Sequence, residues 1–288
     1  MKLALAPSPV CRICRRTELG SLAEKDGFSF CKCFNCGYVF ADPMPSQAEL
    51  DQLYDASHFK SSYDPNGAEN PDLLAKRDLQ YVQDAEVLTQ FVASGRLLDF
   101  GCGNGRFLGT FPDSFEKFGY ELNPVTQEYL RRQNAFHVVG SREELEAMDD
   151  GLFDAVTMRG VIEHLEDPLS AVELLCRKLK VGGHLLICAT PNMDSPCALV
   201  NGTEWNQFNP PYHIHFFSPR SLALLFANHG VALIETRMPY LDTPYADPDA
   251  DAKAFVDAAR SYLDADDSVR SPAFPGTMMT LTFRKVCT

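Results

Sequence analysis

Basic residues are scarce in this chain of 288 residues, where 26 Lys and Arg stand against 39 Asp and Glu. The formal net charge is therefore −13 at pH 7. Nucleic-acid binders normally carry a basic face that replaces the counterions of the phosphates. The negative charge of this chain repels polyanions, so the composition disfavours a nucleic-acid partner.

Long apolar runs are also missing, since none approaches the roughly 20 residues that a membrane span requires. The first ten residues, MKLALAPSPV, lack the apolar core of a secretory signal peptide. We therefore expect a cytoplasmic protein with no membrane partner. In that compartment cysteines are expected to be reduced thiols or metal ligands rather than disulfides.

Cysteine itself is plentiful, with ten residues. Cys11 and Cys14 form one C-x-x-C pair, and Cys33 and Cys36 form a second pair after 18 intervening residues. This spacing is typical of structural zinc sites, in which two tight turns each supply two thiolates to one tetrahedral ion. Cys31 offers a further thiol that would replace Cys33 in an alternative ligand set. Four thiolates leave no open position for a substrate, so we predict a structural zinc ribbon.

Turn signals and composition divide the chain into three expected regions: a zinc ribbon at 1–45, a linker with lid helices at 46–95, and a main domain at 96–288. In the second region, Ser46 and Glu49 form a capping box that predicts a short helix. Residues 56–71 are polar and rich in turn formers, and we expect them to form a connector between this helix and the next. Residues 72–95 have the apolar spacing of an amphipathic helix, which Gly95 is expected to end.

From residue 96 onward, short apolar runs alternate with helical segments, as is typical of a doubly wound parallel sheet. Seven strands are predicted, at 96–100, 115–122, 136–140, 153–160, 182–191, 231–238 and 277–286. The expected fold is α/β, with a Rossmann-like, mostly parallel, seven-stranded sheet. An insert at 239–276 contains a predicted helix at 250–263. The insert is either a lid or binding loop or a solvated acidic excursion.

The stretch LLDFGCGNGRFL places three glycines directly behind the first predicted strand. Gly101, Gly103 and Gly105 allow positive φ and let a ligand lie against the backbone. The next helix supplies free amides at its N-terminus. Arg106 stands where a dinucleotide fingerprint needs its third glycine, and the P-loop sequence is absent. Glu121, at the end of the second strand, is placed to accept hydrogen bonds from two ribose hydroxyls.

With these motifs the chain resembles the class I S-adenosylmethionine-dependent methyltransferases, over residues 75–238 and the last strand. LLDFGCGNGRFL resembles their first motif, GYELNP the second, FDAVTMRGVIEHLEDP the fourth and LKVGGHLLICATPN the fifth. The resemblance implies that the glycines frame the methionine portion of the cofactor, that Glu121 holds the ribose and that Leu122 flanks the adenine. The cofactor-binding residues expected on this basis are Asp99, Gly101, Cys102, Gly103, Gly105, Glu121, Leu122 and Arg159.

Some members of this family carry a zinc ribbon before the domain, including C-methyltransferases of nucleotide-linked deoxysugars. Their Tyr-His-x-His segment is similar to PYHIHFFSP here. That resemblance implies Tyr212 as a substrate ligand and His215 as a general base. Two further candidates are His164, which follows the fourth strand beside the expected reacting methyl group, and His213, in the same segment as His215. Each histidine would otherwise hold a loop by hydrogen bonds, and Arg159 would hold an anionic group or form a surface salt bridge.

The expected function is in-line methyl transfer from S-adenosylmethionine to a small molecule, a sugar or a specialised metabolite, with structural Zn²⁺ in the ribbon. Two alternatives stay open. One is a methyltransferase of RNA or protein that docks its substrate through the ribbon. The other is a non-catalytic scaffold that binds the cofactor. The acceptor atom and the oligomeric state are also left open.

Overall fold

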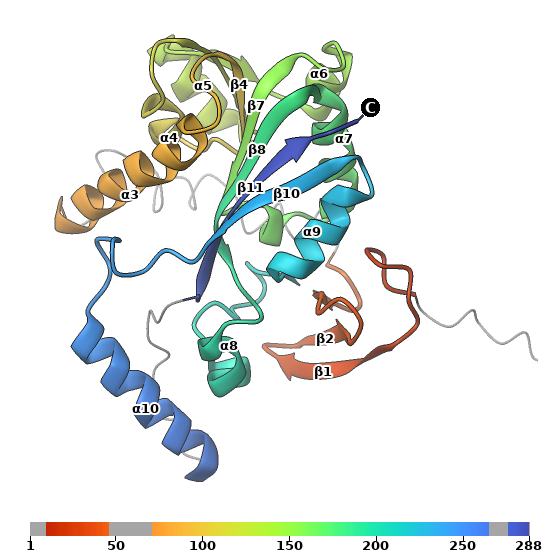
Figure 1. Ribbon diagram of the computed structural model, residues 1–288, viewed down its shortest axis with the longest axis vertical. Coiled ribbons are helices and arrows are strands. Elements are labelled where there is room, and N and C mark those ends of the chain that lie inside the picture. The colour runs from red at the N-terminus through yellow and green to blue at the C-terminus, as the bar shows by residue number, and fades with distance from the viewer. Residues whose placement is uncertain (1–9, 46–70, 265–275, 288) are drawn as a thin grey trace, which may run out of the picture.

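The computed structural model describes residues 10–45, 71–264 and 276–287 (Figure 1). Its centre is a seven-stranded sheet with the order β10-β11-β8-β7-β4-β5-β6. The strands are β4 (Gly95–Phe100), β5 (Phe115–Tyr120), β6 (His137–Val139), β7 (Phe153–Arg159), β8 (Leu179–Pro191), β10 (Val231–Arg237) and β11 (Met278–Lys285). β11 is antiparallel to both of its neighbours, and the other four pairs are parallel. This confirms the predicted fold class and each of the seven predicted strands.

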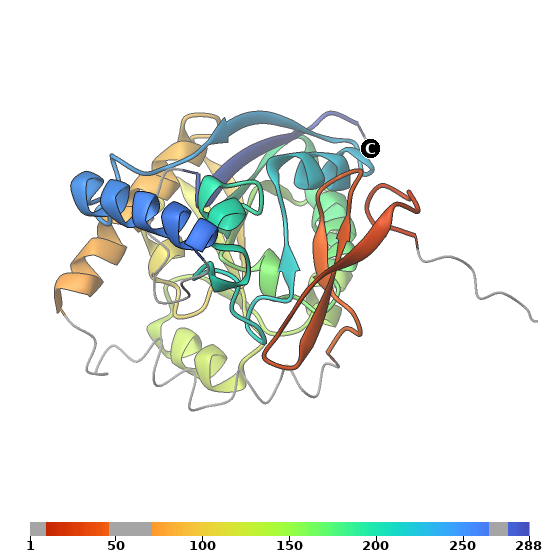
Figure 2. The ribbon, with the colours of Figure 1, turned by 90° about the horizontal axis from the view of Figure 1, so that it is seen from below.

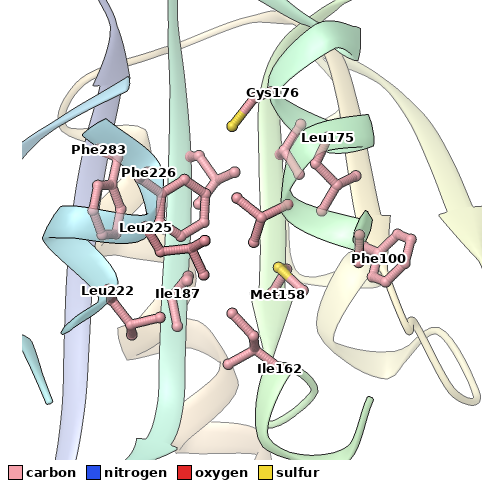
Figure 3. Close-up of a cluster of buried hydrophobic side chains, with 14 of the residues drawn as sticks. Phe100, Met158, Ile162, Leu175, Cys176, Ile187, Leu222, Leu225, Phe226 and Phe283 are labelled. Carbon is pink, nitrogen blue, oxygen red and sulfur yellow. The ribbon is translucent and has the colours of Figure 1, made fainter. Parts of the chain in front are cut away.

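Helices cover both faces of this sheet. The helices are α3 (Pro71–Thr89), α4 (Arg106–Gly109), α5 (Pro124–Gln133), α6 (Arg142–Ala147), α7 (Pro168–Lys178), α8 (Pro196–Asn201), α9 (Pro219–Ala227) and α10 (Pro248–Asp264). Of these, α8 and α10 do not cover the sheet but pack against each other below it in Figure 1. Side chains alternate along the strands, so Leu97 packs against α3 and α4 while its neighbour Leu98 belongs to the opposite core. Figure 3 shows that second core, where Leu175 of α7 and Phe226 of α9 meet Met158 of β7.

A second, four-stranded sheet joins the N-terminal ribbon to the main domain. The ribbon supplies β1 (Leu19–Lys25), β2 (Phe28–Cys33) and β3 (Val39–Ala41), and the main domain supplies β9 (His215–Phe216). All three pairs of neighbouring strands in this sheet are antiparallel. In both Figure 1 and Figure 2 the ribbon strands, red to orange, lie on the side of α9, away from α3. The ribbon is therefore part of the same hydrogen-bonded structure as residues 215–216.

The structure tests two predicted helices, one before the main sheet and one in the insert. The predicted helix at 72–95 ends at Thr89, not at Gly95, which instead opens β4 with φ +120°. A Cβ at this position would overlap the carboxylate of Asp154, which accepts a hydrogen bond from Arg96 N at 2.8 Å. Glycine is thus required to start the strand. In the insert, the predicted helix is confirmed as α10, which packs against α8.

The predicted capping box at Ser46 and Glu49, and the connector as far as residue 70, lie outside the described residues. Over the three described ranges, no helix combines the length and the apolar character that crossing a membrane would take.

Candidate active site

The glycine loop occupies the carboxyl end of β4, where it turns the chain into α4. Gly101, Gly103 and Gly105 all have positive φ, at +80°, +52° and +79°. A Cβ on Gly101 would lie 2.7 Å from Cγ2 of Val161, and one on Gly105 would overlap the ring of Phe136. Both conformation and space therefore require glycine, as the sequence predicted.

Glu121 connects this loop to the second strand. Its Oε2 accepts a hydrogen bond from Gly103 N at 3.1 Å, and its Oε1 accepts one from Asn123 N at 2.8 Å. Burial raises the pKa of the carboxyl, which these backbone donors partly offset. Each carboxylate oxygen can accept a second hydrogen bond. Ribose binding by Glu121 therefore remains a prediction with acceptor capacity to support it, and the adjacent Leu122, 57% exposed, remains the predicted adenine contact.

A cavity of about 370 Å³ opens beside the glycine loop. Five of the predicted cofactor-binding residues line it: Asp99, Gly101, Cys102, Gly103 and Arg159. Gly105, Glu121 and Leu122 are not among its lining residues. The structure thus gathers five of the eight predicted cofactor residues around one cavity at the carboxyl edge of the sheet, where ligands bind in doubly wound folds.

Asp99 is the buried acid among these five residues, with 2% of its surface exposed. Thr157 Oγ1 donates a hydrogen bond to its Oδ1 at 2.6 Å. Burial raises the pKa of Asp99 to about 7, and the bond from Thr157 opposes that rise. The acid is therefore positioned to become a carboxylate when a cationic ligand, such as an ammonium or a sulfonium, enters the cavity.

Asp99→Asn is expected to remove part of the pH dependence of stability in the cofactor-free protein. Because the pKa of Asp99 is raised in the folded state, the folded chain binds this proton more tightly than the unfolded chain. The free energy of unfolding therefore falls as the pH rises from about 4 to about 7, by up to about 4 kcal/mol, and is level above that window. Denaturant melts of both proteins across this window measure the difference, and identical pH profiles would contradict it.

Arg159 reaches the cavity but is already engaged by α3. Its Nε donates to Asp84 Oδ2 at 2.9 Å, and its guanidinium lies over the ring of Tyr81 at 4.4 Å. Asp84 is 4% exposed, so this is a buried ion pair rather than the surface salt bridge that was the alternative expectation. Sequence reasoning missed Asp84 and Tyr81, although an acid within the apolar face of an amphipathic helix was a usable signal.

Glu163, His164 and His213 also line the cavity, and we call these three residues the acceptor wall. Glu163 is 2% exposed, and Thr190 Oγ1 donates to its Oε2 at 3.3 Å. The rings of His164 and His213 are 4.6 Å apart and edge-to-face. Burial raises the pKa of Glu163 to about 8. The structure therefore brings two of the three candidate histidines, His164 and His213, to the cavity.

His215 occupies a different place from the one expected of a general base. It is fully buried, does not line the cavity, and is hydrogen-bonded through Nδ1 to Tyr38 OH of the ribbon at 2.6 Å. Burial lowers its pKa to about 4. His213 lies just before β9, directly after the turn at 210–212, and lines the cavity, whereas His215 lies within β9 and contacts the ribbon. Tyr212, also expected at the site, is 41% exposed and contributes its carbonyl to His164 rather than its side chain to the cavity.

The cysteine pairs of the ribbon converge on one point. The sulfurs of Cys11, Cys14, Cys33 and Cys36 all lie within 4.8 Å of one another, with distances of 3.6 Å for Cys11–Cys36 and 3.5 Å for Cys14–Cys33. Four thiolates around one Zn²⁺ stand about 3.8 Å apart, so the donor set fits the predicted ion. Cys31 instead lies 3.7 Å from Asp42 Oδ2, which selects Cys33 over Cys31 as the fourth member.

The main domain is similar in sequence to known proteins. Residues 74–236 match the family described as Methyltransferase domain. The Ubiquinone biosynthesis O-methyltransferase of Xanthomonas euvesicatoria pv. vesicatoria (strain 85-10) is 29% identical over 204 residues, which cover 65% of this chain and 81% of that protein.

Solved structures agree on the fold. The geranyl diphosphate C-methyltransferase from Streptomyces coelicolor A3(2), solved with S-adenosyl-L-homocysteine, has a TM-score of 0.56 at 16% identity over 84% of this chain and 100% of that chain. A SAM dependent methyltransferase from Archaeoglobus fulgidus has a TM-score of 0.50 at 20% identity, over 75% and 95%. The fold and the glycine loop define the class I methyltransferases. This chain belongs to the methyltransferase-domain family and is an S-adenosylmethionine-dependent methyltransferase.

Proposed function

We propose that the enzyme methylates a hydroxyl group of a small molecule held between the glycine loop and the acceptor wall. The observation that carries this proposal is that one cavity of about 370 Å³ joins the two. That volume lies within the range of small-molecule sites. The O-methyltransferase named above supports oxygen as the acceptor atom, and the net charge of −13 argues against a polyanionic substrate.

The glycine loop and the residues next to it would bind S-adenosylmethionine. Asp99 and the backbone of Gly101 and Gly103 would hold the methionine portion, with Glu121 on the ribose and Leu122 against the adenine. When bound, S-adenosylmethionine supplies an activated methyl group on a sulfonium. The protein's own contribution is then to align the acceptor with that methyl group and to exclude water from the cavity.

The chemical step is an in-line displacement. A lone pair of the acceptor oxygen forms the new C–O bond, the S–C bond breaks, and its electron pair stays on sulfur, which becomes a neutral thioether. The acceptor proton must leave, and the acceptor wall is the polar surface that faces it. His164 is our proposed base, because its Nδ1 faces the carbonyl oxygen of Tyr212 at 2.7 Å, which places the proton on Nδ1 and the lone pair on Nε2.

The ribbon, residues 1–45, would act as a structural unit around Zn²⁺. Two consecutive backbone hydrogen bonds connect the ribbon to the acceptor wall. Ala41 N donates to the Ile214 carbonyl at 2.9 Å, and Ile214 N donates to the Glu163 carbonyl at 3.1 Å. We therefore propose that the ribbon supports the acceptor wall rather than docking a macromolecule.

Incubation with methyl-labelled S-adenosylmethionine and a size-fractionated cell extract tests the substrate class. Label recovered as a methyl ether in the small-molecule fraction is the expected result. Label in RNA or protein would replace the proposal with the macromolecular alternative. Tight cofactor binding without any transferred label would favour the non-catalytic scaffold.

His164→Ala is expected to lower the methyl-transfer rate by about 10²- to 10⁴-fold while cofactor affinity stays unchanged. The matched control is His137→Ala, because His137 is an exposed histidine 3.5 Å from a glutamate, Glu116, at the far edge of the sheet. Single-turnover rates and cofactor titrations of both variants check this. A His164 variant with the rate of the parent protein would remove the acceptor wall from the mechanism.

A further inference from the structure

We propose that the three residues of the acceptor wall form a binding site for one divalent transition-metal ion. One ligand atom from each of Glu163, His164 and His213 lies within 4.8 Å of the others, and His164 Nε2 is 4.0 Å from Glu163 Oε1. All three line the cavity that faces the glycine loop. This site is separate from the four cysteines of the ribbon and uses a different donor set.

The two imidazoles are oriented by the same kind of backbone contact. Nδ1 of His164 lies 2.7 Å from the Tyr212 carbonyl oxygen, and Nδ1 of His213 lies 2.7 Å from the Gln207 carbonyl oxygen. A carbonyl only accepts, so each Nδ1 carries the proton and each Nε2 carries the lone pair. Metal-binding histidines characteristically donate their second ring N–H in this way, which fixes both the tautomer and the ring orientation.

The burial of Glu163 is a second observation that supports a cation site, independent of the histidines. Its side chain is 2% exposed and forms no ion pair with a Lys or Arg among the residues that the structure describes. A backbone N–H and the neutral hydroxyl of Thr190, at 3.3 Å, donate to it, and the positive charge of Arg159 acts on it from a distance, but together they offset its burial only in part. An ionised carboxylate at such a buried position requires a compensating positive charge. A bound cation would supply that charge from within the cavity.

The donor set restricts the identity of the ion. Two imidazoles and one carboxylate suit Mn²⁺, Fe²⁺, Co²⁺ or Zn²⁺, whereas the thiolates of the ribbon select softer ions. Donors bound at about 2.1 Å in a tetrahedron stand about 3.4 Å apart, so the side chains would close by roughly an ångström on binding. Three protein ligands leave a coordination position open, as catalytic rather than structural sites do.

The consequence for chemistry rests on the proposed function, whereas metal binding itself does not. An ion at the acceptor wall would lie where the acceptor hydroxyl is expected and would lower the pKa of that hydroxyl. With the ion bound, His164 would act as a ligand and the acceptor proton would pass to solvent; without the ion, His164 is left as the base proposed above. The acceptors favoured by such a site are those with oxygen donors able to complete the coordination shell.

Manganese binding to the zinc-loaded protein tests the site without any acceptor. Mn²⁺ is chosen because it disfavours thiolates and its free form has a six-line paramagnetic resonance signal. We expect one Mn²⁺ per chain. Glu163→Gln and His213→Ala should each weaken binding by at least about 100-fold, as expected for loss of one ligand in three. His137→Ala should bind as the parent protein does, and cofactor affinity of every variant reports on folding.

Two results would overturn the proposal. One is a manganese site that survives in both Glu163→Gln and His213→Ala. The other is the absence of any bound Mn²⁺, together with no Co²⁺ or Zn²⁺ beyond the ribbon equivalent. Methyl transfer to a small molecule by protein that binds no metal at the wall would leave the proposed function standing while this inference fails. Metal bound at the wall without methyl transfer to any small molecule would do the reverse.

Discussion

Gly101→Ala is expected to lower the affinity for S-adenosylmethionine by at least about 100-fold. Gly101 has φ +80°, and its Cβ would lie 2.7 Å from Cγ2 of Val161. A left-handed backbone with a side chain costs about 1–3 kcal/mol, and the overlap adds about 1–3 kcal/mol of overpacking. Val161 immediately precedes Ile162–His164, so relief of the overlap displaces both sides of the cavity. Calorimetric titration with the cofactor measures the loss.

Gly109→Ala is the matched control for this change. Gly109 is the last residue of α4, has no unusual φ, and has open space where the new methyl group would lie. Alanine improves helix propensity by about 1 kcal/mol, so stability should stay level or rise while cofactor affinity is unchanged. Equal affinities of the Gly101 and Gly109 variants would show that the conformation of the first glycine does not govern binding.

Cys36→Ser is expected to abolish zinc binding and to lower methyl transfer by at least about 100-fold, because small misplacements of reacting groups carry penalties of that size. Without the ion, the ribbon loses the main source of its folding energy. The antiparallel pairing of Phe40 with His215 then fails, and His213 shifts with it. Cofactor affinity should change less than about 3-fold, since the glycine loop follows β4, which belongs to a different sheet from the ribbon strands.

Cys31→Ser separates the loss of zinc from the loss of a thiol. Cys31 lies in the same strand as Cys33 but faces Asp42, so this variant should keep one zinc per chain and the full methyl-transfer rate. Metal analysis and initial rates of the two variants make the comparison. A Cys36 variant that lost zinc but kept the parent rate would show that the ribbon does not support the acceptor wall.

The strands of the main sheet could be predicted because apolar runs bounded by turn residues are local signals. The glycine loop could be predicted for the same reason, since a glycine's freedom is a property of its own position. Gly95 shows the limit of that reasoning. A glycine after a helical pattern indicates a C-cap, yet here the tertiary approach of Asp154 places it at the start of a strand.

The acceptor wall could be predicted only in part, because its members come from two loops almost fifty positions apart. The sequence shows His213 and His215 as equivalents within one segment, and only the pairing of β9 with β3 decides which of them faces the cavity. In the same way, the pairing of Arg159 with Asp84 depends on how α3 lies across the sheet. Contacts of this kind follow from assembly of the whole fold rather than from any local pattern.

The sheet that ribbon and main domain build together also has a consequence for synthesis of the chain. Tyr38 and its partner His215 are 177 positions apart, so at about 5–20 residues per second the ribbon waits roughly 10–35 s on the ribosome before β9 emerges. During that interval β3 is an unpaired edge, the feature through which nascent chains pair with one another. Its three residues, Val39–Ala41, offer very few hydrogen bonds to a wrong partner. A short edge therefore protects the growing chain until its own strand arrives.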